Sequence, residues 1–174
     1  PRPALAPVDS PIQPRFHAKL FTSYKKRQPR IGEYAGQSAS EGNAIRKAYL
    51  SNSTTRKIEP GDILLFYRSQ DEREITSLGI CEDIRYGLED PDKISKIVGK
   101  RSVFSDREIK ELATSPTTVL LFSWHFEFPT PITDTQLYEN DVLQGPPQVM
   151  QQIDEQGYEY IRKEGDIDER FARH

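Results

Sequence analysis

The run Asp62–Arg68 (DILLFYR) limits the fold more than any other segment of the chain. It follows the turn-forming pair Pro60-Gly61, and its centre is an unbroken series of aliphatic and aromatic residues. A strand without polar alternation is buried on both faces, so we expect it inside a sheet that is covered on both sides. Residues 75–84 read as its antiparallel neighbour across polar residues 70–74, and the two segments predict a hairpin.

A second strong strand is expected from Thr118 to Phe128, where apolar and polar residues alternate. The alternation predicts one shared face for five apolar residues: Leu120, Phe122, Trp124, Phe126 and Phe128. Pro129 and Pro131 are expected to end this strand, because proline has no backbone N–H to donate. Residues 100–104 read as a further, short strand.

Four short helices are also expected. Asp90-Pro91 is a typical start for one of them, and Ser105 with Glu108 forms a capping box for the next. The other two are placed over residues 41–50 and around residues 148–155. In the helix over 41–50, the apolar spacing predicts one buried stripe, with Arg46 and Lys47 pointing outward.

The net charge of −3 conceals two oppositely charged parts of the chain. Residues 15–68 hold 11 Lys or Arg against 4 acidic residues, a net +7, whereas residues 69–174 hold 12 against 22, a net −10. A basic segment in an acidic chain is typical of a surface that meets a polyanion. It is equally typical of a solvated face on which charges happen to cluster, and the charge alone leaves both interpretations open.

Length and composition fit one globular domain with tails, since the chain has 174 residues, of which 35% are hydrophobic and 10% aromatic. Five of the 13 prolines fall in the first 14 residues, so residues 1–11 are expected to form an extended linker or tail. The domain itself is expected over residues 12–132. Residues 133–174, with 10 acidic against 4 basic residues, are expected to be an acidic C-terminal extension with a helix.

The inventory of catalytic groups is poor. Cys81 is the single cysteine, which excludes an internal disulfide and a cysteine-cluster metal site and favours a reducing, cytoplasmic location. His17, His125 and His174 are too far apart for a metal motif, and no P-loop, G-x-G-x-x-G or G-x-S-x-G occurs. No apolar run of about 18 residues and no signal peptide is found. We therefore expect no metal, no cofactor and no membrane contact, and we assign no catalytic residue.

The residues that remain suit an aromatic ligand beside a phosphate backbone. Candidates for contact with the ligand's ring are aromatic or short polar side chains: Tyr49, Phe66, Tyr67, Trp124, Asn43, Ser51, Ser53 and Ser69. Candidates for contact with phosphate are basic side chains: Arg46, Lys47, Arg56, Lys57 and Arg68. Phe66 and Trp124 lie in strands built like core, so each of them either packs inside or touches the ligand.

Three segments resemble the PUA-like superfamily, particularly its EVE and ASCH domains: residues 42–50 (GNAIRKAYL), 58–69 (IEPGDILLFYRS) and 75–82 (ITSLGICE). In those domains a helix precedes a pGD-type strand and a facing strand of a small barrel. Residues 12–128, about two thirds of the chain, also resemble the PUA-like module of some prokaryotic proteins described as GNAT-type acetyltransferases. Residues 100–105 (KRSVFS) are similar to a signature of that module.

The resemblance implies an α+β fold: a small mixed, mainly antiparallel β-barrel with flanking short helices. It also implies a pocket, which in EVE and YTH domains receives a modified base. Matching segments would place seven residues at or beside that pocket: Asn43, Lys47, Tyr67, Arg68, Ser69, Thr76 and Ser77. Lys100 and Arg101, at the start of the KRSVFS segment, join the predicted phosphate contacts. The tryptophan cage of YTH domains is not matched, because Trp124 is the only tryptophan.

The leading hypothesis is a non-catalytic module that binds RNA or DNA, takes one base, in particular a modified base, and holds phosphates with the basic segment. The first alternative is a nuclease of the kind suspected for some ASCH proteins, with Lys47, Tyr67 and Asp62 near the cleft. The second is a regulatory or protein-interaction domain of a larger acetyltransferase-like protein, which would associate with another domain or protein.

Overall fold

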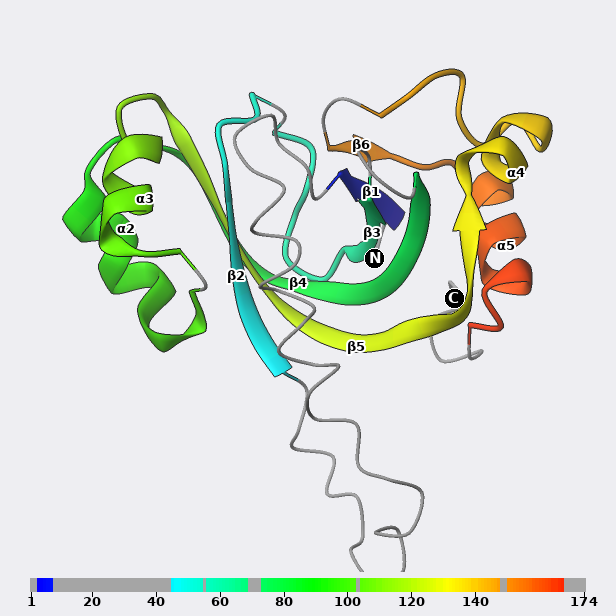
Figure 1. Ribbon diagram of the computed structural model, residues 1–174, viewed down its shortest axis with the longest axis horizontal. Helices are drawn as coiled ribbons and strands as arrows, with labels where there is room; N and C mark the ends of the chain where they lie inside the picture. The colour runs from blue at the N-terminus through cyan, green and yellow to red at the C-terminus, as the bar shows by residue number, and fades with distance from the viewer. Residues whose placement is uncertain are drawn as a thin grey trace, which may run out of the picture.

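The computed structural model describes residues 3–7, 45–54, 56–68, 73–102, 104–147 and 150–167 (Figure 1). Asn43, Ser69, the first part of the expected helix over 41–50 and the end of the chain lie outside these ranges. The described part contains strands, four α-helices and one short 3-10 helix in this order: β1 (Pro3–Pro7), β2 (Ile45–Ser51), β3 (Ile63–Arg68), β4 (Glu74–Leu88), α2 (Pro91–Val98), η1 (Gly99–Arg101), α3 (Asp106–Leu112), β5 (Thr117–Thr133), α4 (Asp134–Glu139), β6 (Gln151–Gln152) and α5 (Glu155–Glu164).

The described strands form one mixed, mainly antiparallel sheet in the order β2-β5-β4-β3-β1-β6. Only β1 and β3 pair in parallel; the other neighbours are antiparallel. The α+β class and the β3–β4 hairpin are thus confirmed. The predicted β-barrel is corrected to an open sheet among the described strands, which ends at β2 and β6 without joining them, and β6 offers only two residues for pairing. The long strands β4 and β5 nevertheless bend the sheet strongly (Figure 1).

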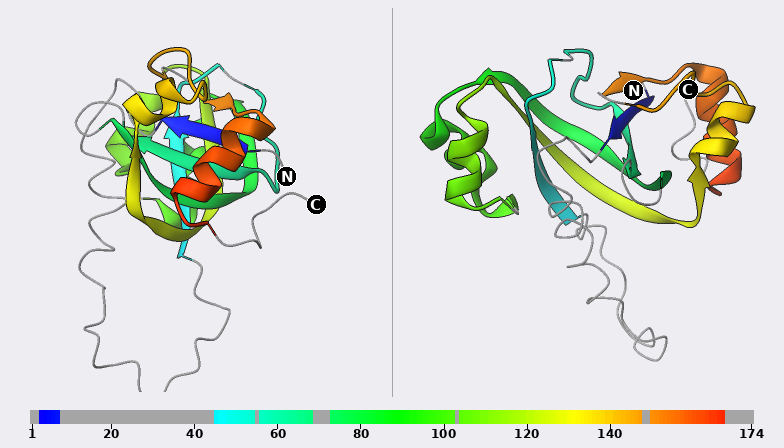
Figure 2. Two further views of the ribbon diagram at one scale, coloured as in Figure 1. Left: turned by 90° about the vertical axis from the view of Figure 1, so that its right-hand side faces the viewer. Right: turned by 45° about the horizontal axis from the view of Figure 1, so that its top comes forward.

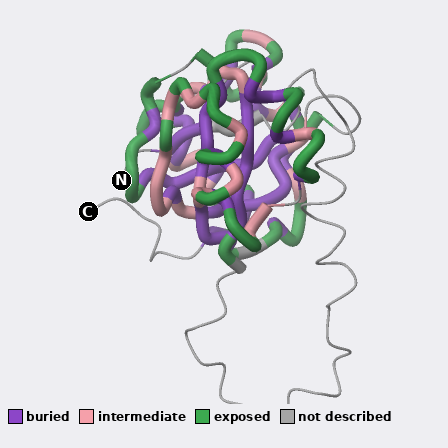
Figure 3. Tube along the Cα trace, turned by 90° about the vertical axis from the view of Figure 1, so that its left-hand side faces the viewer, coloured by how far each residue is buried: buried purple, intermediate pink, exposed green. Residues whose placement is uncertain are grey.

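Two helical layers cover the outside of this bent sheet. Helices α2 and α3 lie at one end, and α4 and α5 lie against the other (Figures 1 and 2). The core has two clusters of buried residues, and β3 contributes to both: Leu64 and Phe66 belong to the first, whereas Ile63, Leu65 and Tyr67 belong to the second. The expectation that β3 is buried on both faces is confirmed, and Figure 3 shows the buried centre between exposed rims.

Strand β5 does not end at its prolines but continues to Thr133. Its ladder with β4 is interrupted there: Ser77 pairs with Glu127 and Ile75 with Ile132, so Pro129 and Pro131 lie in an irregular stretch that needs no N–H donor. The predicted strand end is therefore wrong. A strand tolerates a proline wherever no carbonyl of the neighbouring strand needs a hydrogen bond from that position.

The segment expected to be a helix over residues 41–50 forms strand β2 from Ile45 onward. Every residue of β2 pairs with β5, and Ala48, Tyr49 and Leu50 are all buried. A helix would have buried a single stripe, whereas β2 is buried on both faces between the α2–α3 layer and the inside of the sheet. Burial on both sides therefore overrides the helical spacing, and the prediction was wrong.

The other helix predictions had mixed outcomes. Asp90 caps α2 and Ser105 forms the capping box of α3 with Glu108, as predicted. Residues 99–101 form η1 instead of a strand, and Ser102 makes only a single parallel bridge to Ala48. The helix expected around residues 148–155 is displaced: α5 begins at Glu155 after the cap Asp154, and residues 151–152 form β6.

Both ends of the described chain join the sheet and its core. Residues 3–7, within the expected linker, form β1, which pairs with β3 and β6. Residues of α4 and α5, within the expected acidic extension, supply Leu137, Tyr158 and Ile161 to the second core cluster. The division of the chain at residues 11 and 132 stays a prediction.

A polar contact joins the β3–β4 hairpin to α4. The Arg73 guanidinium lies 2.6 Å from the Asp134 carboxylate, and the Asp134 backbone N–H donates to the Arg73 carbonyl over 2.8 Å. Tyr67 lies beside them; burial raises the pKa of its hydroxyl, and the charge of Asp134 adds to that rise. Asp134 is buried, so its carboxylate depends on Arg73 for compensation.

We expect Arg73→Ala to lower the melting temperature by several degrees, because it leaves the Asp134 carboxylate buried without its cation. The control is Arg107→Ala, which removes the exposed pair of Arg107 with Glu111 on α3 and is expected to change little. Thermal unfolding followed by circular dichroism measures both. Equal melting temperatures for the two variants would contradict the role given to Arg73.

Candidate functional site

Strand register gathers a set of side chains on one side of the sheet, which we call the inner face. Directly paired residues share a face. Lys47 of β2 pairs with Phe122 of β5, Trp124 of β5 pairs with Gly79 of β4, and Phe66 of β3 pairs with Ser77 of β4. These six residues define the inner-face set: Lys47, Phe66, Ser77, Gly79, Phe122 and Trp124.

Gly79 lets two aromatic rings of the inner-face set lie close to the sheet. A Cβ at this position would lie 2.8 Å from the Ser123 carbonyl oxygen, 3.1 Å from the Phe66 ring and 3.3 Å from the Phe122 ring. The two rings contact each other with centroids 4.8 Å apart. The backbone of Gly79 is not in the left-handed region, so its conformation does not require a glycine. The lack of space for a Cβ does.

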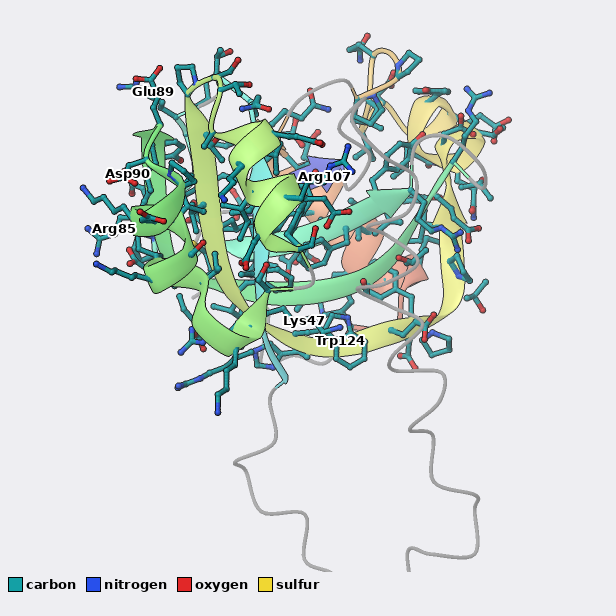
Figure 4. All side chains as sticks on the ribbon, turned by 60° about the vertical axis from the view of Figure 1, so that its left-hand side comes forward. Lys47, Arg85, Glu89, Asp90, Arg107 and Trp124 are labelled. Atoms are coloured by element: carbon teal, nitrogen blue, oxygen red, sulfur yellow. The ribbon has the colours of Figure 1, made fainter. Side chains whose placement is uncertain are left out.

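Lys47 is a cationic side chain in an apolar setting. Its exposed fraction is only 7%, and burial lowers the pKa of its ammonium group. Trp124, which pairs with the residue two positions before Lys47, lies next to it at the same end of β2 (Figure 4). An ammonium group next to an indole and a phenyl ring can donate hydrogen bonds to a flat ligand with acceptor atoms.

Two hydroxyl groups at the start of β4 are buried without hydrogen-bond partners among the described residues. Ser77 is 0% exposed and Thr76 is 6% exposed, and neither hydroxyl oxygen has a partner there. Buried hydroxyls are nearly always hydrogen-bonded, to protein or to an ordered small molecule. Ser77 belongs to the inner-face set, so its buried hydroxyl faces that side of the sheet.

The structure brings together only part of the predicted base contacts. Phe66, Ser77 and Trp124 share the inner face with Lys47, but Tyr67 lies in the second core cluster on the opposite side, because neighbouring strand residues alternate. Tyr49 is buried, with its ring 6.4 Å from that of Phe104. Phe66 and Tyr67, both predicted to contact the base, therefore lie on opposite sides of the sheet.

Phe122 and Gly79 are the members of the inner-face set that the sequence analysis did not name as site residues. The alternation in residues 118–128 already placed Phe122 and Trp124 on one face. It failed beyond them, since the ladder with β4 skips His125, and Phe128 falls into the second core cluster. A bulge of this kind shifts the alternation by one residue, and its position cannot be predicted from the residue types in the segment.

The predicted phosphate contacts do not form one surface. Lys47 is buried on the inner face, whereas its neighbour Arg46 is exposed on the outer face, so the prediction that both point outward holds only for Arg46. The remaining predicted contacts lie in three places: Arg101, next to Lys100 in η1, shares the Glu82 carboxylate with Arg46; Arg56 and Lys57 lie between β2 and β3; and Arg68 lies at the end of β3.

The groups considered for catalysis are also dispersed. Asp62 is 4% exposed and accepts a hydrogen bond from the Glu59 backbone N–H, while Tyr67 lies on the outer side of the sheet. Burial raises the pKa of the Cys81 thiol to about 12, which keeps it protonated and a poor nucleophile. Among the described residues, no group of His, Cys, Asp and Glu is placed to hold a metal ion.

None of the helices within the described ranges is long and apolar enough to cross a bilayer.

No family model and no curated protein matches the chain. Solved structures do match in fold. A serine-to-alanine mutant of ZmASCH from Zymomonas mobilis is 15% identical with a TM-score of 0.65, covering 93% of this chain and 95% of that one. The ASCH structure from Zymomonas mobilis is 16% identical with a TM-score of 0.62, covering 93% and 94%. A hypothetical protein from Leishmania major is 13% identical with a TM-score of 0.56, covering 95% and 94%.

These likenesses show that the chain has the fold of the ASCH structures from Zymomonas mobilis. At this level of identity they extend to the fold alone. The acetyltransferase context receives no support from any of the comparisons and stays a prediction.

We expect Gly79→Ala to destabilise the protein by about 1–3 kcal/mol, because the added methyl group meets the Ser123 carbonyl and the two phenyl rings. The matched control is Gly145→Ala, where an added Cβ meets nothing within 4 Å. Urea unfolding gives both free energies. If Gly79→Ala unfolds at the same urea concentration as the control, the close packing described for the inner face is incorrect.

Proposed function

We propose that the protein binds single-stranded RNA or DNA and takes one base against the inner face of the sheet. The observation that carries the proposal is that three chemically different groups share this face: the buried ammonium of Lys47, the hydroxyl of Ser77, which has no partner among the described residues, and the indole of Trp124. A hydrophobic core does not require such a combination, and each group is suited to one part of a nucleotide base.

A base presents two flat faces and an edge of donors and acceptors. Stacking on an aromatic side chain contributes about 1–3 kcal/mol per base, and Trp124 supplies such a face. Lys47 donates only, so it suits ring oxygen and nitrogen acceptors, whereas the Ser77 hydroxyl both donates and accepts. The ASCH-type fold supports the proposal at the level of architecture, since the sequence resembles superfamily members that receive a base.

Selection for a modified base is the finer part of the proposal. The chain has a single tryptophan, so an aromatic cage built from several tryptophans is not available. Recognition of a modification would instead fall to the small and polar groups at the start of β4, Thr76 and Ser77, whose hydroxyls are buried and without partners among the described residues. An added or missing group on the base edge changes how those hydroxyls are satisfied, which is a strong source of discrimination.

A hydrolytic function is the second candidate, and one observation favours it. Burial lowers the pKa of Lys47, so its ammonium group gives up a proton more readily than that of an exposed lysine, which favours a role in proton transfer. Tyr67 lies on the opposite side of the sheet, and the Asp62 carboxylate accepts a hydrogen bond from the Glu59 backbone N–H, so a cleavage reaction would depend on Lys47.

We expect Lys47→Met to weaken binding of a fluorescent single-stranded oligonucleotide about tenfold, and to reduce the salt slope of binding by about 1 if Lys47 also meets a phosphate. Methionine keeps the length of the side chain and removes the cost of burying an ammonium group, so the fold should persist. The matched control is Lys163→Met on the exposed side of α5, which should leave the affinity unchanged.

The measurement is fluorescence anisotropy with RNA and DNA, unmodified and modified, at two salt concentrations, with circular dichroism of each variant. The same samples are run on a denaturing gel. An oligonucleotide cut by the native protein but not by Lys47→Met would replace the binding function by the hydrolytic one. Absence of binding to every oligonucleotide, or equal affinity for Lys47→Met and Lys163→Met, would overturn the proposal.

A further inference from the structure

A second cluster of polar groups lies on the outer face of the sheet, behind the inner-face set. Arg46 of β2 pairs with Ser123 of β5, so both point away from Lys47 and Trp124. The Ser123 hydroxyl oxygen lies 3.2 Å from Nε2 of His125, which is exposed. Glu82 of β4 reaches the same place, because its carboxylate contacts Arg46.

Glu82 holds two guanidinium groups side by side. One of its carboxylate oxygens lies 3.1 Å from Nε of Arg46, and the other lies 3.0 Å from Nη1 of Arg101. The two contacts use one nitrogen of each guanidinium, and a guanidinium carries five N–H donors. The Arg46 side chain is 62% exposed and that of Arg101 33%, so further donors face solvent.

The charge of this cluster is positive in spite of the shared carboxylate. Arg46, Arg101 and the exposed Lys100 next to it carry three positive charges against the single negative charge of Glu82. Two arginines that are already oriented lose less side-chain entropy on binding an anion than two mobile ones. Planar guanidinium groups match the oxygens of phosphate, and the Ser123 hydroxyl and His125 ring add hydrogen-bonding groups beside them.

We propose that this outer cluster, formed by Arg46, Glu82, Lys100, Arg101, Ser123 and His125, is a contact site for the phosphodiester backbone of a single-stranded nucleic acid. The inference rests on the proposed function and deepens it: the base lies at the inner face of β2, and the neighbouring phosphates lie at its outer face. Glu82 acts as a positioning residue, because its carboxylate holds one nitrogen of each guanidinium group at this site.

The first test is the double variant Arg46→Gln/Arg101→Gln in the oligonucleotide anisotropy experiment. We expect an affinity loss of about tenfold or more and a salt slope lower by about 1–2, because two phosphate contacts are removed. The matched control is Arg107→Gln/Lys110→Gln, which makes the same change of net charge on α3, where Arg107 lies well apart from Lys47 (Figure 4). Equal effects of the two double variants would overturn the outer cluster while leaving the inner-face function standing.

A purely structural role for the two ion pairs predicts a different result. In that case the double variant would lose melting temperature, and Lys100→Gln, which breaks no ion pair with Glu82, would keep full affinity. We expect Lys100→Gln to weaken binding about two- to fivefold with an unchanged melting temperature. Full affinity of Lys100→Gln together with a destabilised double variant would overturn the proposal.

An independent readout separates this site from the proposed function. The His125 ring resonances, assigned with His125→Gln, are followed by NMR while inorganic polyphosphate or polyglutamate is added. We expect polyphosphate to shift them and polyglutamate at equal charge to shift them less. If no oligonucleotide binds but polyphosphate still shifts His125, the phosphate site stands and the base-binding function fails; no shift, or a preference for polyglutamate, overturns the site.

Discussion

The antiparallel pairing of β4 with β5 is the contact on which the rest of the structure depends. These two strands run through the whole described part of the molecule, and each is bent and bulged along its length. One end of the pair, together with β2, carries the α2–α3 layer, and the other carries β3, β1 and the α4–α5 layer. The bulges matter as much as the pairing, because they bend the sheet until Phe66 of β3 meets Phe122 of β5 over Gly79 of β4.

Because the sheet is bent, the two sides of β2 have different environments: Lys47 is buried on one side, and Arg46 is exposed on the other. Lys47 is buried among aromatic side chains, whereas Arg46, its neighbour in sequence, is exposed and forms an ion pair with Glu82. The charge count of the basic segment therefore overstates the size of any single basic surface. A polyanion that bound on both sides of β2 would contact one buried cation, Lys47, on one side and the two guanidinium groups held by Glu82 on the other.

The sequence was most informative where local signals and burial agreed. The buried strand 63–68, its hairpin partner and the caps at Asp90 and Ser105 could be predicted because each depends on adjacent residues. The helix expected over 41–50 failed because burial of β2 on both faces is a tertiary effect. The candidate site was half predictable: Lys47, Phe66, Ser77 and Trp124 were named, but their separation from Tyr67 follows from strand alternation and bulges, which no single residue type reveals.

The single thiol of the chain lies at the centre of this arrangement. Cys81 is 2% exposed in the middle of β4, directly beside Phe122, and burial keeps its thiol protonated. An alkylating reagent can reach the Cys81 sulfur only after the packing around it has opened locally, so the rate of alkylation reports how often this happens. Cys81 is thus a built-in reporter of local opening in the middle of the sheet. A ligand bound on the inner face would lower the rate of Cys81 alkylation without contacting the sulfur, because it would make such openings rarer.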